Sequence, residues 1–224
     1  MSELTLVIPV KNEKESISIF LTELTKFNFK ILTVVDPLDK DTIESIKKFE
    51  VVEILNQQKP GYGNALIEGV NNTKTKFFCI INADGSMNPK YLGKMLEACL
   101  SKDFVFASRY LKDGGSDDDD IITFVGNKIF SAIGNIFFNL NISDILFTYI
   151  LGKTSSFKSL NLGYYDFRIC VEIPIKMKNL NMNYEVIPSF ERSRIAGKKK
   201  VSPFKDGTLI LFALIKLFFK KNRN

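Results

Sequence analysis

Residues Leu4–Val10 read LTLVIPV, and the next three residues, Lys11, Asn12 and Glu13, are polar. A short apolar run rich in β-branched side chains is typical of a strand buried in a sheet. The polar residues that follow lie where a strand of an α/β sheet would present its carboxyl end to a ligand. This segment predicts a buried first strand, and the pattern of the segments after it indicates the type of sheet.

Strand-like and helix-like segments alternate from this strand to residue 108. Further strands are predicted at 29–35, 51–55, 77–82 and 104–108, and helices at 12–27, 41–49, 62–72 and 89–100. Strands that alternate with helices at this spacing form βαβ units, in which the strands run parallel. We therefore expect an α/β fold with a mostly parallel central sheet flanked by helices.

The pattern changes after residue 109, and the remainder is expected to be largely helical. The four aspartates at 117–120 lie in a Gly- and Asp-rich loop without EF-hand spacing, so a solvated loop is expected. The following segments are helices with one very apolar face (121–149), a helix (166–178), a short strand (184–188), a basic stretch (191–200) and a strongly apolar stretch (208–219).

The composition is that of a globular domain, since 45% of the 224 residues are hydrophobic and 25% are charged. This excludes a disordered or fibrous chain. Lysine and arginine number 31 against 25 acidic residues, and the net charge of +6 favours an anionic partner: nucleotide phosphate, nucleic acid or anionic lipid. The chain has no histidine, which excludes Ser-His, Cys-His and His-metal chemistry and leaves carboxylates, Lys, Arg and hydroxyl groups.

The sequence favours a cytoplasmic protein. The three cysteines, Cys79, Cys99 and Cys170, are odd in number and far apart, which is typical of buried thiols in a reducing compartment. No signal peptide is expected before the first strand, and no uncharged apolar run reaches the roughly 18 residues that a membrane span requires.

Polar residues follow the predicted strands at the edge where parallel sheets bind ligands. Asp84 stands in NADGS (82–86) on a tight turn, where one carboxylate can hold Mg²⁺ or Mn²⁺ against a diphosphate. The alternative is a turn residue that caps the next helix. Asp36, after the second strand, is likewise either an acceptor for a ribose or base, or a structural cap.

Two further segments suit an anionic ligand. The stretch KPGYGNA (59–65) lacks the third glycine of a dinucleotide fingerprint and the Gly-Lys-Ser/Thr of a Walker loop, so we interpret it as a tight turn with Lys59 facing an anion. The basic residues around Gly197 can stabilise a departing diphosphate, or they form an exposed patch that binds nucleic acid or lipid. They are Arg192, Arg194, Lys198, Lys199 and Lys200.

Taken in order, these motifs resemble glycosyltransferase family 2, the inverting enzymes of the GT-A fold. VIPVKNE (7–13) resembles their opening strand and loop, TVVD (33–36) their nucleoside-binding segment, and NADGS (82–86) their Asp-x-Asp metal motif. ASRY (107–110) with Gly114-Gly115, and RIAGKKK (194–200), are similar to stretches of the dolichol- and polyprenyl-phosphate sugar transferases. The similarity runs from Leu4 to about Lys200.

The resemblance implies a GT-A nucleotide-diphospho-sugar transferase fold in one domain, residues 1–200, with a nucleotide-binding half at 1–110 and an acceptor-side half at 111–200. An apolar and basic C-terminal helix follows at 201–224. The implied reaction is the inverting transfer of a sugar from a UDP- or GDP-linked donor to a polyprenyl-phosphate or glycan acceptor, with Mg²⁺ or Mn²⁺ on the diphosphate.

The resemblance also assigns residues to the donor. Asp84 is the implied metal ligand, and Arg109 and Tyr110 belong to a loop between donor and acceptor. The implied nucleotide-binding residues are Pro9, Val10, Asn12, Glu13, Asp36, Lys59, Gly63, Asn82, Ala83, Lys198, Lys199 and Lys200.

The implied catalytic residues are Arg194, which stabilises the departing diphosphate, and the carboxylates Asp144 and Glu172. A lipid phosphate needs no base, whereas a sugar hydroxyl does, and without histidine Asp144 is the first candidate and Glu172 the second. The alternative for Asp144 is a helix cap. Two positions depart from the family pattern: Asn82 replaces the first acid of the metal motif, and the residues after Asp144 are not the usual Gly-Phe-Arg.

The C-terminal segment bears on the acceptor. Residues 208–219 are too few to span a bilayer but apolar enough to lie on one, with Lys220, Lys221 and Arg223 beside them. Packing against the core is the alternative. A membrane-bound helix favours a lipid-linked acceptor and a place at the inner face of the membrane.

Three other functions are weighed against a transferase. A sugar-phosphate nucleotidyltransferase carries a Gly-rich loop with Arg after its first strand, where this chain has Lys11, Asn12 and Glu13. A non-catalytic nucleotide-sugar or membrane-surface binding module is supported by Asn82 and by the altered segment after Asp144. A nucleic-acid partner is not expected, because no known module occurs and the aspartates at 117–120 interrupt a basic face.

Overall fold

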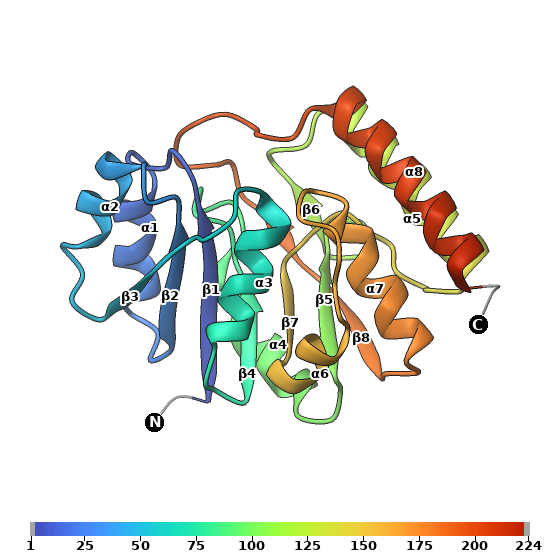
Figure 1. The fold of residues 1–224 in the computed structure, drawn as a ribbon, viewed down its shortest axis with the longest axis horizontal. Helices are drawn as coiled ribbons and strands as arrows, with labels where there is room; N and C mark the ends of the chain where they lie inside the picture. Colours follow the sequence, from blue (N-terminus) through green and yellow to red (C-terminus); the bar gives the residue numbers. More distant parts are fainter. Residues whose placement is uncertain (1–2, 222–224) are drawn as a thin grey trace.

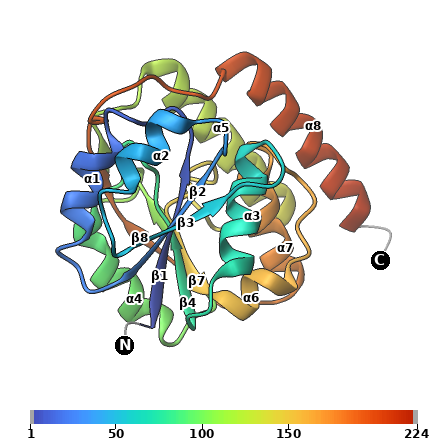
Figure 2. The ribbon, with the colours of Figure 1, turned by 60° about the vertical axis from the view of Figure 1, so that its left-hand side comes forward.

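Residues 3–221 are described in the computed structural model, and they form a central sheet with helices on both faces (Figure 1, Figure 2). The strands are β1 (Leu4–Val10), β2 (Lys30–Val35), β3 (Val52–Asn56), β4 (Phe77–Ile80), β5 (Phe104–Ser108), β6 (Gly115–Ser116), β7 (Ile150–Lys153), β8 (Tyr184–Pro188) and β9 (Phe190–Glu191). The helices are α1 (Ile17–Leu24), α2 (Lys40–Ile46), α3 (Tyr62–Asn72), the 3-10 helix η1 (Pro89–Tyr91), α4 (Leu92–Cys99), α5 (Ile121–Phe138), α6 (Thr154–Ser159), α7 (Ile169–Asn179) and α8 (Pro203–Lys221).

The main sheet has seven strands in the order β3-β2-β1-β4-β7-β5-β8. The pairs β1–β2, β1–β4, β2–β3 and β5–β8 are parallel, so the predicted mostly parallel α/β sheet is confirmed. β7 runs antiparallel to both β4 and β5, between which it is inserted. The sequence pattern does not predict β7, because its four residues directly follow a long apolar stretch with helical character.

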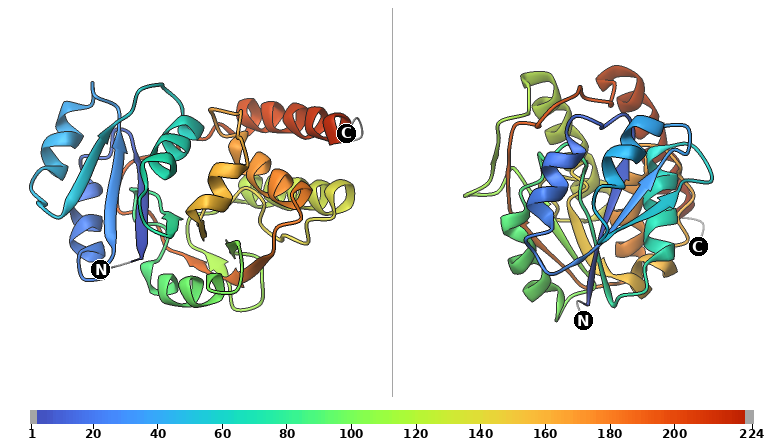
Figure 3. Two further views of the ribbon diagram at one scale, coloured as in Figure 1. Left: turned by 60° about the horizontal axis from the view of Figure 1, so that its bottom comes forward. Right: turned by 90° about the vertical axis from the view of Figure 1, so that its left-hand side faces the viewer.

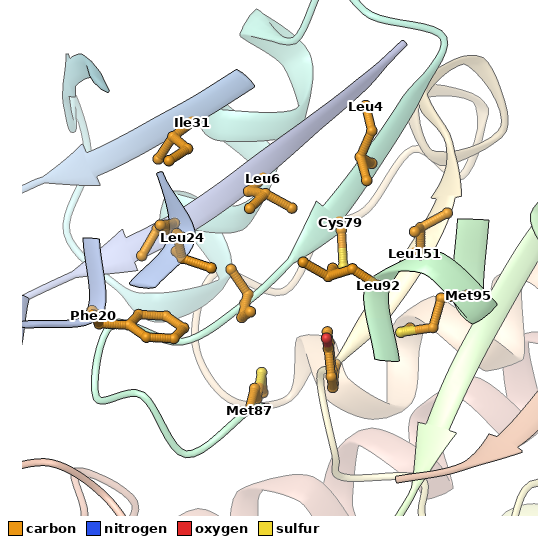
Figure 4. Packing of buried hydrophobic residues seen from close by; sticks show 14 of the residues in the cluster. Leu4, Leu6, Phe20, Leu24, Ile31, Cys79, Met87, Leu92, Met95 and Leu151 are labelled. Atoms are coloured by element: carbon orange, nitrogen blue, oxygen red, sulfur yellow. The ribbon is translucent and has the colours of Figure 1, made fainter. Parts of the chain in front are cut away.

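Side chains of β1 alternate between the two faces of the sheet, as the period of a strand requires. Leu4 and Leu6 belong to a core under α1, α2 and α4, whereas Val7 belongs to a second core under α3, α5, α6, α7 and α8. Figure 4 shows the first core, where Leu4 and Leu6 lie near Cys79 of β4 and Leu24 of α1. Apolar side chains are therefore buried on both faces of the sheet, and this burial stabilises it.

Several predicted boundaries shift for local reasons. α2 begins at Lys40, because the carboxylate of Asp39, rather than Asp41, accepts the N–H of Thr42 at 3.4 Å. α5 ends at Phe138, where Asn139 takes a left-handed conformation with φ of 55°. α7 begins at Ile169 instead of residue 166, which leaves Asp166 in a loop.

The C-terminal helix packs onto the domain. Its side chains Ile210, Ala213, Leu214 and Leu217 are buried, and α8 lies against α5 and α7 (Figure 3, left). Within residues 3–221, α5 is the helix that is long and apolar enough to cross a membrane by length and composition, with a mean hydropathy of 1.5 over 18 residues. This helix was not predicted as a candidate span from the sequence, because Lys128 in its middle interrupts the uncharged apolar run.

Candidate active site

The carboxyl ends of β1 and β2 and the turn after β4 surround a pocket of about 570 Å³. Basic residues from the segment after β9 close its other side. The sequence-predicted residues that line it are Pro9, Val10, Asn12, Glu13, Asp36, Asn82, Ala83, Asp84, Arg194, Lys198 and Lys200. The predicted convergence of strand ends and basic loop is therefore what the structure contains.

Asp84 lies at the floor of this arrangement. Its Oδ1 accepts the N–H of Ser86 at 3.0 Å, and its backbone carbonyl accepts the N–H of Ile195 at 2.8 Å. The second bond ties the basic segment to the metal-motif turn, and it places Nη1 of Arg194 3.6 Å from Oδ2 of Asp84. Asp84 thus closes its own turn and presents a carboxylate oxygen to the pocket, whereas the next helix, η1, is capped by Asn88 and not by Asp84.

The oxygens near Asp84 are compatible with a magnesium or manganese ion. Within residues 3–221 no group of three or more Asp, Glu, Cys or His side chains is placed to hold a metal. In the turn after β4, the hard oxygen donors that line the pocket are the Asp84 carboxylate and Oδ1 of Asn82, which accepts the Tyr62 hydroxyl at 3.3 Å. Two such donors suit Mg²⁺ or Mn²⁺ only where diphosphate oxygens and water complete the coordination.

The acidic loop at 117–120 pairs with the basic segment and with Arg109, so the expectation of a solvated loop is wrong for Asp118 and Asp119. Asp118 accepts Nη2 of Arg194 at 2.6 Å and Nε at 3.1 Å. Asp120 accepts Nζ of Lys199 at 3.2 Å, and hydrogen bonds from Thr123, then from Lys199, lower the pKa of Asp120 to about 2. Arg194 and Lys199, two of the cations expected to meet a diphosphate, are therefore bound by carboxylates of the acidic loop.

Two other basic residues are also paired. Nζ of Lys200 donates to the Glu13 carboxylate, which accepts the Ser16 hydroxyl as well. Arg192 turns away from the pocket and forms a bidentate pair with Glu23 at 2.9 and 3.0 Å. Arg192 therefore holds the segment to α1, whereas Arg194 and Lys200 remain at the pocket.

The turn before α3 approaches another loop so closely that it has no room for side chains. A Cβ on Gly61, whose φ is 116°, would lie 2.2 Å from the carbonyl oxygen of Tyr165, and one on Gly63 would lie 2.5 Å from that of Tyr164. The ring of Tyr62 stacks on Phe167 with 4.8 Å between centroids. The glycines serve backbone packing, and Lys59 does not line the pocket.

Arg109 and Asp144 form a buried ion cluster outside the pocket. Asp144, 1% exposed, accepts Nε of Arg109 at 2.7 Å and Nη2 at 2.9 Å, while Nη1 lies 3.1 Å from Asp119 and 3.0 Å from Glu191. Burial, the largest single effect, disfavours the charged guanidinium, but Asp144, Glu191 and Asp119 together outweigh it, and the pKa of Arg109 is raised. The helix-cap alternative is not what the structure contains: Asp144 holds Arg109.

Glu172 has a positioning role. It is 3% exposed, accepts the N–H groups of Gly163 at 2.9 Å and Tyr164 at 2.8 Å, and pairs with Lys176 at 2.9 Å. These bonds fix the loop that packs on the turn before α3. Neither Glu172 nor Asp144 reaches the pocket, and both therefore lack access to a substrate proton in this structure.

Sequence reasoning assigned seven residues to the site that do not line the pocket: Lys59, Gly63, Arg109, Tyr110, Asp144, Glu172 and Lys199. It missed the lining residues Lys11, Gln57, Pro60, Gly61, Tyr62, Ala65, Asp166, Phe167, Val201, Ser202, Lys205 and Asp206. The paired glycines at 61 and 63 were the signal that another loop packs there. Nothing in the sequence indicated which loop.

The sequence profile of glycosyl transferase family 2 matches residues 5–160. The dolichol-phosphate mannosyltransferase of Pyrococcus furiosus is 24% identical over 187 residues, which cover 79% of this chain and 53% of that protein. An uncharacterized glycosyltransferase of Mycobacterium tuberculosis is 32% identical over 92 residues, 41% of each chain. The chain thus spans about half, or less, of the length of these curated relatives.

Solved structures share the fold. Glucosyl-3-phosphoglycerate synthase of Mycobacterium tuberculosis, in complex with Mn²⁺, UDP and glucosyl-3-phosphoglycerate, has a TM-score of 0.73 at 12% identity, over 96% of this chain and 79% of that one. Mannosyl-3-phosphoglycerate synthase of Rubrobacter xylanophilus has a TM-score of 0.69 at 18% identity, over 98% and 74%. With the family profile matching more than half of its length and the sheet and pocket described above, the chain belongs to glycosyl transferase family 2 and has the GT-A fold.

Proposed function

We propose that this protein transfers a sugar, with inversion, from a UDP- or GDP-linked donor to a polyprenyl-phosphate acceptor, a glycan being the second choice. The observation that carries the proposal is one pocket that combines Asp36, Asp84 and the cations of the segment after β9. The curated relative named as a dolichol-phosphate mannosyltransferase supports the choice of acceptor. The buried free cysteines are in keeping with a cytoplasmic site of action.

The donor nucleoside is assigned to the ends of β1 and β2. One oxygen of Asp36 accepts the N–H of Leu38 at 3.0 Å, and the other carboxylate oxygen remains for a ribose or base donor. Pro9, Val10 and Asn12 line the same side of the pocket. We therefore assign the diphosphate to the side of the pocket toward Asp84, where the strand ends meet the basic segment.

The diphosphate leaving group is assigned to Asp84 and the basic segment. Asp84, with Asn82, would hold Mg²⁺ or Mn²⁺, whose chemistry when bound is to neutralise charge on the diphosphate oxygens. Arg194 lies 3.6 Å from Asp84 and stabilises the same charge with fixed N–H donors, joined by Lys198 and Lys200. Stabilisation that grows as the sugar–phosphate bond breaks lowers the barrier to transfer.

The carboxylates of this site favour a phosphate nucleophile over a hydroxyl. A hydroxyl needs a general base, whereas a phosphate oxygen is already anionic. Asp166 lines the pocket, but its carboxylate accepts hydrogen bonds from Nε of Arg168 at 2.8 Å and from Nη2 at 2.7 Å. These bonds lower the pKa of Asp166, which makes its carboxylate a weak base. Asp144 and Glu172, the two carboxylates that the family resemblance implies as bases, are buried away from the pocket.

The proposal is tested first by thermal stabilisation of the whole chain with UDP, GDP, CDP and dTDP, each with and without Mn²⁺. A ligand at a hundred times its Kd stabilises the folded state by about 2.7 kcal/mol, so one base should raise Tm by several degrees. Asp84→Asn should abolish the metal-dependent part of the shift. The matched control Asp113→Asn changes an exposed carboxylate outside the pocket and should leave the shift intact.

A non-catalytic binding module is the second candidate, and the lone carboxylate beside Asn82 favours it. The two functions are separated by turnover with the nucleotide sugar of the stabilising base and a short polyprenyl phosphate. Release of the nucleoside diphosphate only when the lipid is present supports the transferase. Nucleotide binding without release under these conditions would replace the transferase with the binding module.

A further inference from the structure

Helix α5 has its polar side toward the protein and its apolar side outward. Its buried residues are Asn127, Ser131, Gly134 and Phe138, two of them polar and one without a side chain. Ile121 is 82% exposed and Ile136 75%. A surface helix of a soluble domain shows the opposite arrangement. The exposed apolar residues of α5 are Ile121, Ile122, Phe124, Val125, Ile129, Ile136 and Phe137.

Helix α8 is apolar on two sides. The stripe Ile210, Ala213, Leu214 and Leu217 packs on the domain. A second apolar stripe, at helical spacing, faces outward. Its largest side chains are exposed: Phe204 by 81%, Phe212 by 64% and Phe219 by 63%. The exposed apolar residues of α8 are Phe204, Leu211, Phe212, Ile215 and Phe219.

The two outward stripes form one surface. α5 and α8 pack side by side (Figure 1). The ring centroid of Phe218 lies 5.6 Å from that of Phe137 and 6.1 Å from that of Phe138, and Gly207 of α8 faces the ring of Phe130 of α5. At about 100° per residue, the contact side of each helix lies beside its exposed stripe, and the buried side lies opposite. We call the exposed residues of both helices, as given in the two preceding paragraphs, the α5–α8 surface.

The charges around this surface decide which partner suits it. Lys216 and Lys220 are exposed on α8, on the edge away from α5, and Lys128 is exposed on the opposite edge of α5. α5 contains no acidic residue, and the one acid of α8, Asp206, accepts the N–H of Ser202 at the start of the helix. None of the three lysines forms a salt bridge within residues 3–221.

We propose that the α5–α8 surface docks on an anionic membrane, with both helices in the plane of the interface. An apolar face bordered by lysines matches the boundary between acyl chains and anionic headgroups. A second copy of the chain fits less well, because a symmetric contact through this surface would bring lysines together with no carboxylates between them. The exposed apolar patch is also of the kind that marks a docking site.

The surface adjoins the pocket. Lys205 and Asp206, in the first turn of α8, line the pocket, and Val201 and Ser202 precede them. α5 follows the acidic loop that binds Arg194 and Lys199. Docking would therefore hold the pocket at the headgroup level, where a lipid phosphate could enter it; this last step rests on the proposed function, whereas docking itself does not.

The test is co-sedimentation of the full chain with vesicles of phosphatidylcholine alone or mixed with phosphatidylserine. Binding is expected to the mixed vesicles, and Ile136→Gln with Phe212→Gln should weaken it at least tenfold. The control pair Val51→Gln with Leu100→Gln removes apolar residues of similar exposure from other parts of the molecule and should bind as the wild type does. Lys216→Gln with Lys220→Gln should weaken binding roughly fivefold for each lysine, most at low salt.

Three results would overturn the proposal: no binding of the wild type to anionic vesicles, equal loss in the test and control pairs, or a dimer in sedimentation velocity that Phe212→Gln dissociates. The last result would assign the surface to a second copy. All variants are first checked for an unchanged Tm and an unchanged thermal shift with the stabilising nucleotide. If that nucleotide shift is missing in the wild type while vesicle binding is retained, the proposed function fails and the docking surface stands.

Discussion

Arg109 shows how one residue can change the interpretation of another. The sequence resemblance pairs Asp144 with the acceptor, yet the guanidinium of Arg109 binds both oxygens of that carboxylate and also contacts Asp119 and Glu191. An unpaired buried charge is costly, and the buried guanidinium of Arg109 is paired with these three carboxylates. The cluster therefore anchors β5, the acidic loop and β9 to one another, and its residues are structural in this arrangement.

Glu191 gives this cluster a pH dependence. Burial raises the pKa of Glu191, and the nearby Arg109 only partly opposes that rise. The folded state keeps the proton to higher pH than the unfolded state does, so this group's contribution to stability is full below about pH 4.5 and falls as pH rises through the raised pKa. Glutamine does not titrate. In urea titrations, the free energy of unfolding of Glu191→Gln should therefore increase relative to that of the wild type between about pH 4 and pH 7. A relative stability that falls over this range would contradict the raised pKa.

Ion pairs connect the acidic loop at 117–120 to the basic segment after β9. Asp118 is the main cause of the raised pKa of Arg194, and it lies 4.0 Å from Lys199. A diphosphate at the pocket would compete with Asp118 for these cations. The sequence predicted both segments but not their pairing, because 76 residues separate Asp118 from Arg194 and no local pattern relates them.

Removing this competition should strengthen donor binding. Asp118→Asn keeps the shape of the side chain and removes its charge, so the affinity for the stabilising nucleoside diphosphate should rise about threefold to tenfold, equivalent to about 1 kcal/mol. Isothermal titration calorimetry measures the change. Asp117→Asn, one position earlier and exposed, is the matched control and should bind as the wild type does. Weaker binding by Asp118→Asn would mean that Asp118 positions Arg194 for the ligand instead of competing with it.

Features of the fold that depend on local periodicity could be predicted from the sequence, whereas features that depend on contacts between distant residues could not. The run at Leu4–Val10 and the alternation after it were sufficient to predict the parallel strands β1 to β4. β7 was not predicted, because its four residues are a strand only in the gap between β4 and β5. Asp166 and Phe167 were missed for the same reason, since they reach the pocket only because Gly61 and Gly63 admit their loop.

The position of β7 makes the two proposed halves of the chain dependent on each other. Residues 1–110 contain β4 and β5, which do not pair with each other; β7 joins them, and β8 supplies the other partner of β5. A fragment of residues 1–110 would leave β5 without either partner strand and expose apolar faces of both cores, so it should lack a cooperative transition. The full chain should unfold in one urea transition that coincides in far-ultraviolet circular dichroism and tyrosine fluorescence. Two separated transitions would instead mean that the nucleotide half folds alone and that β7 only docks onto it.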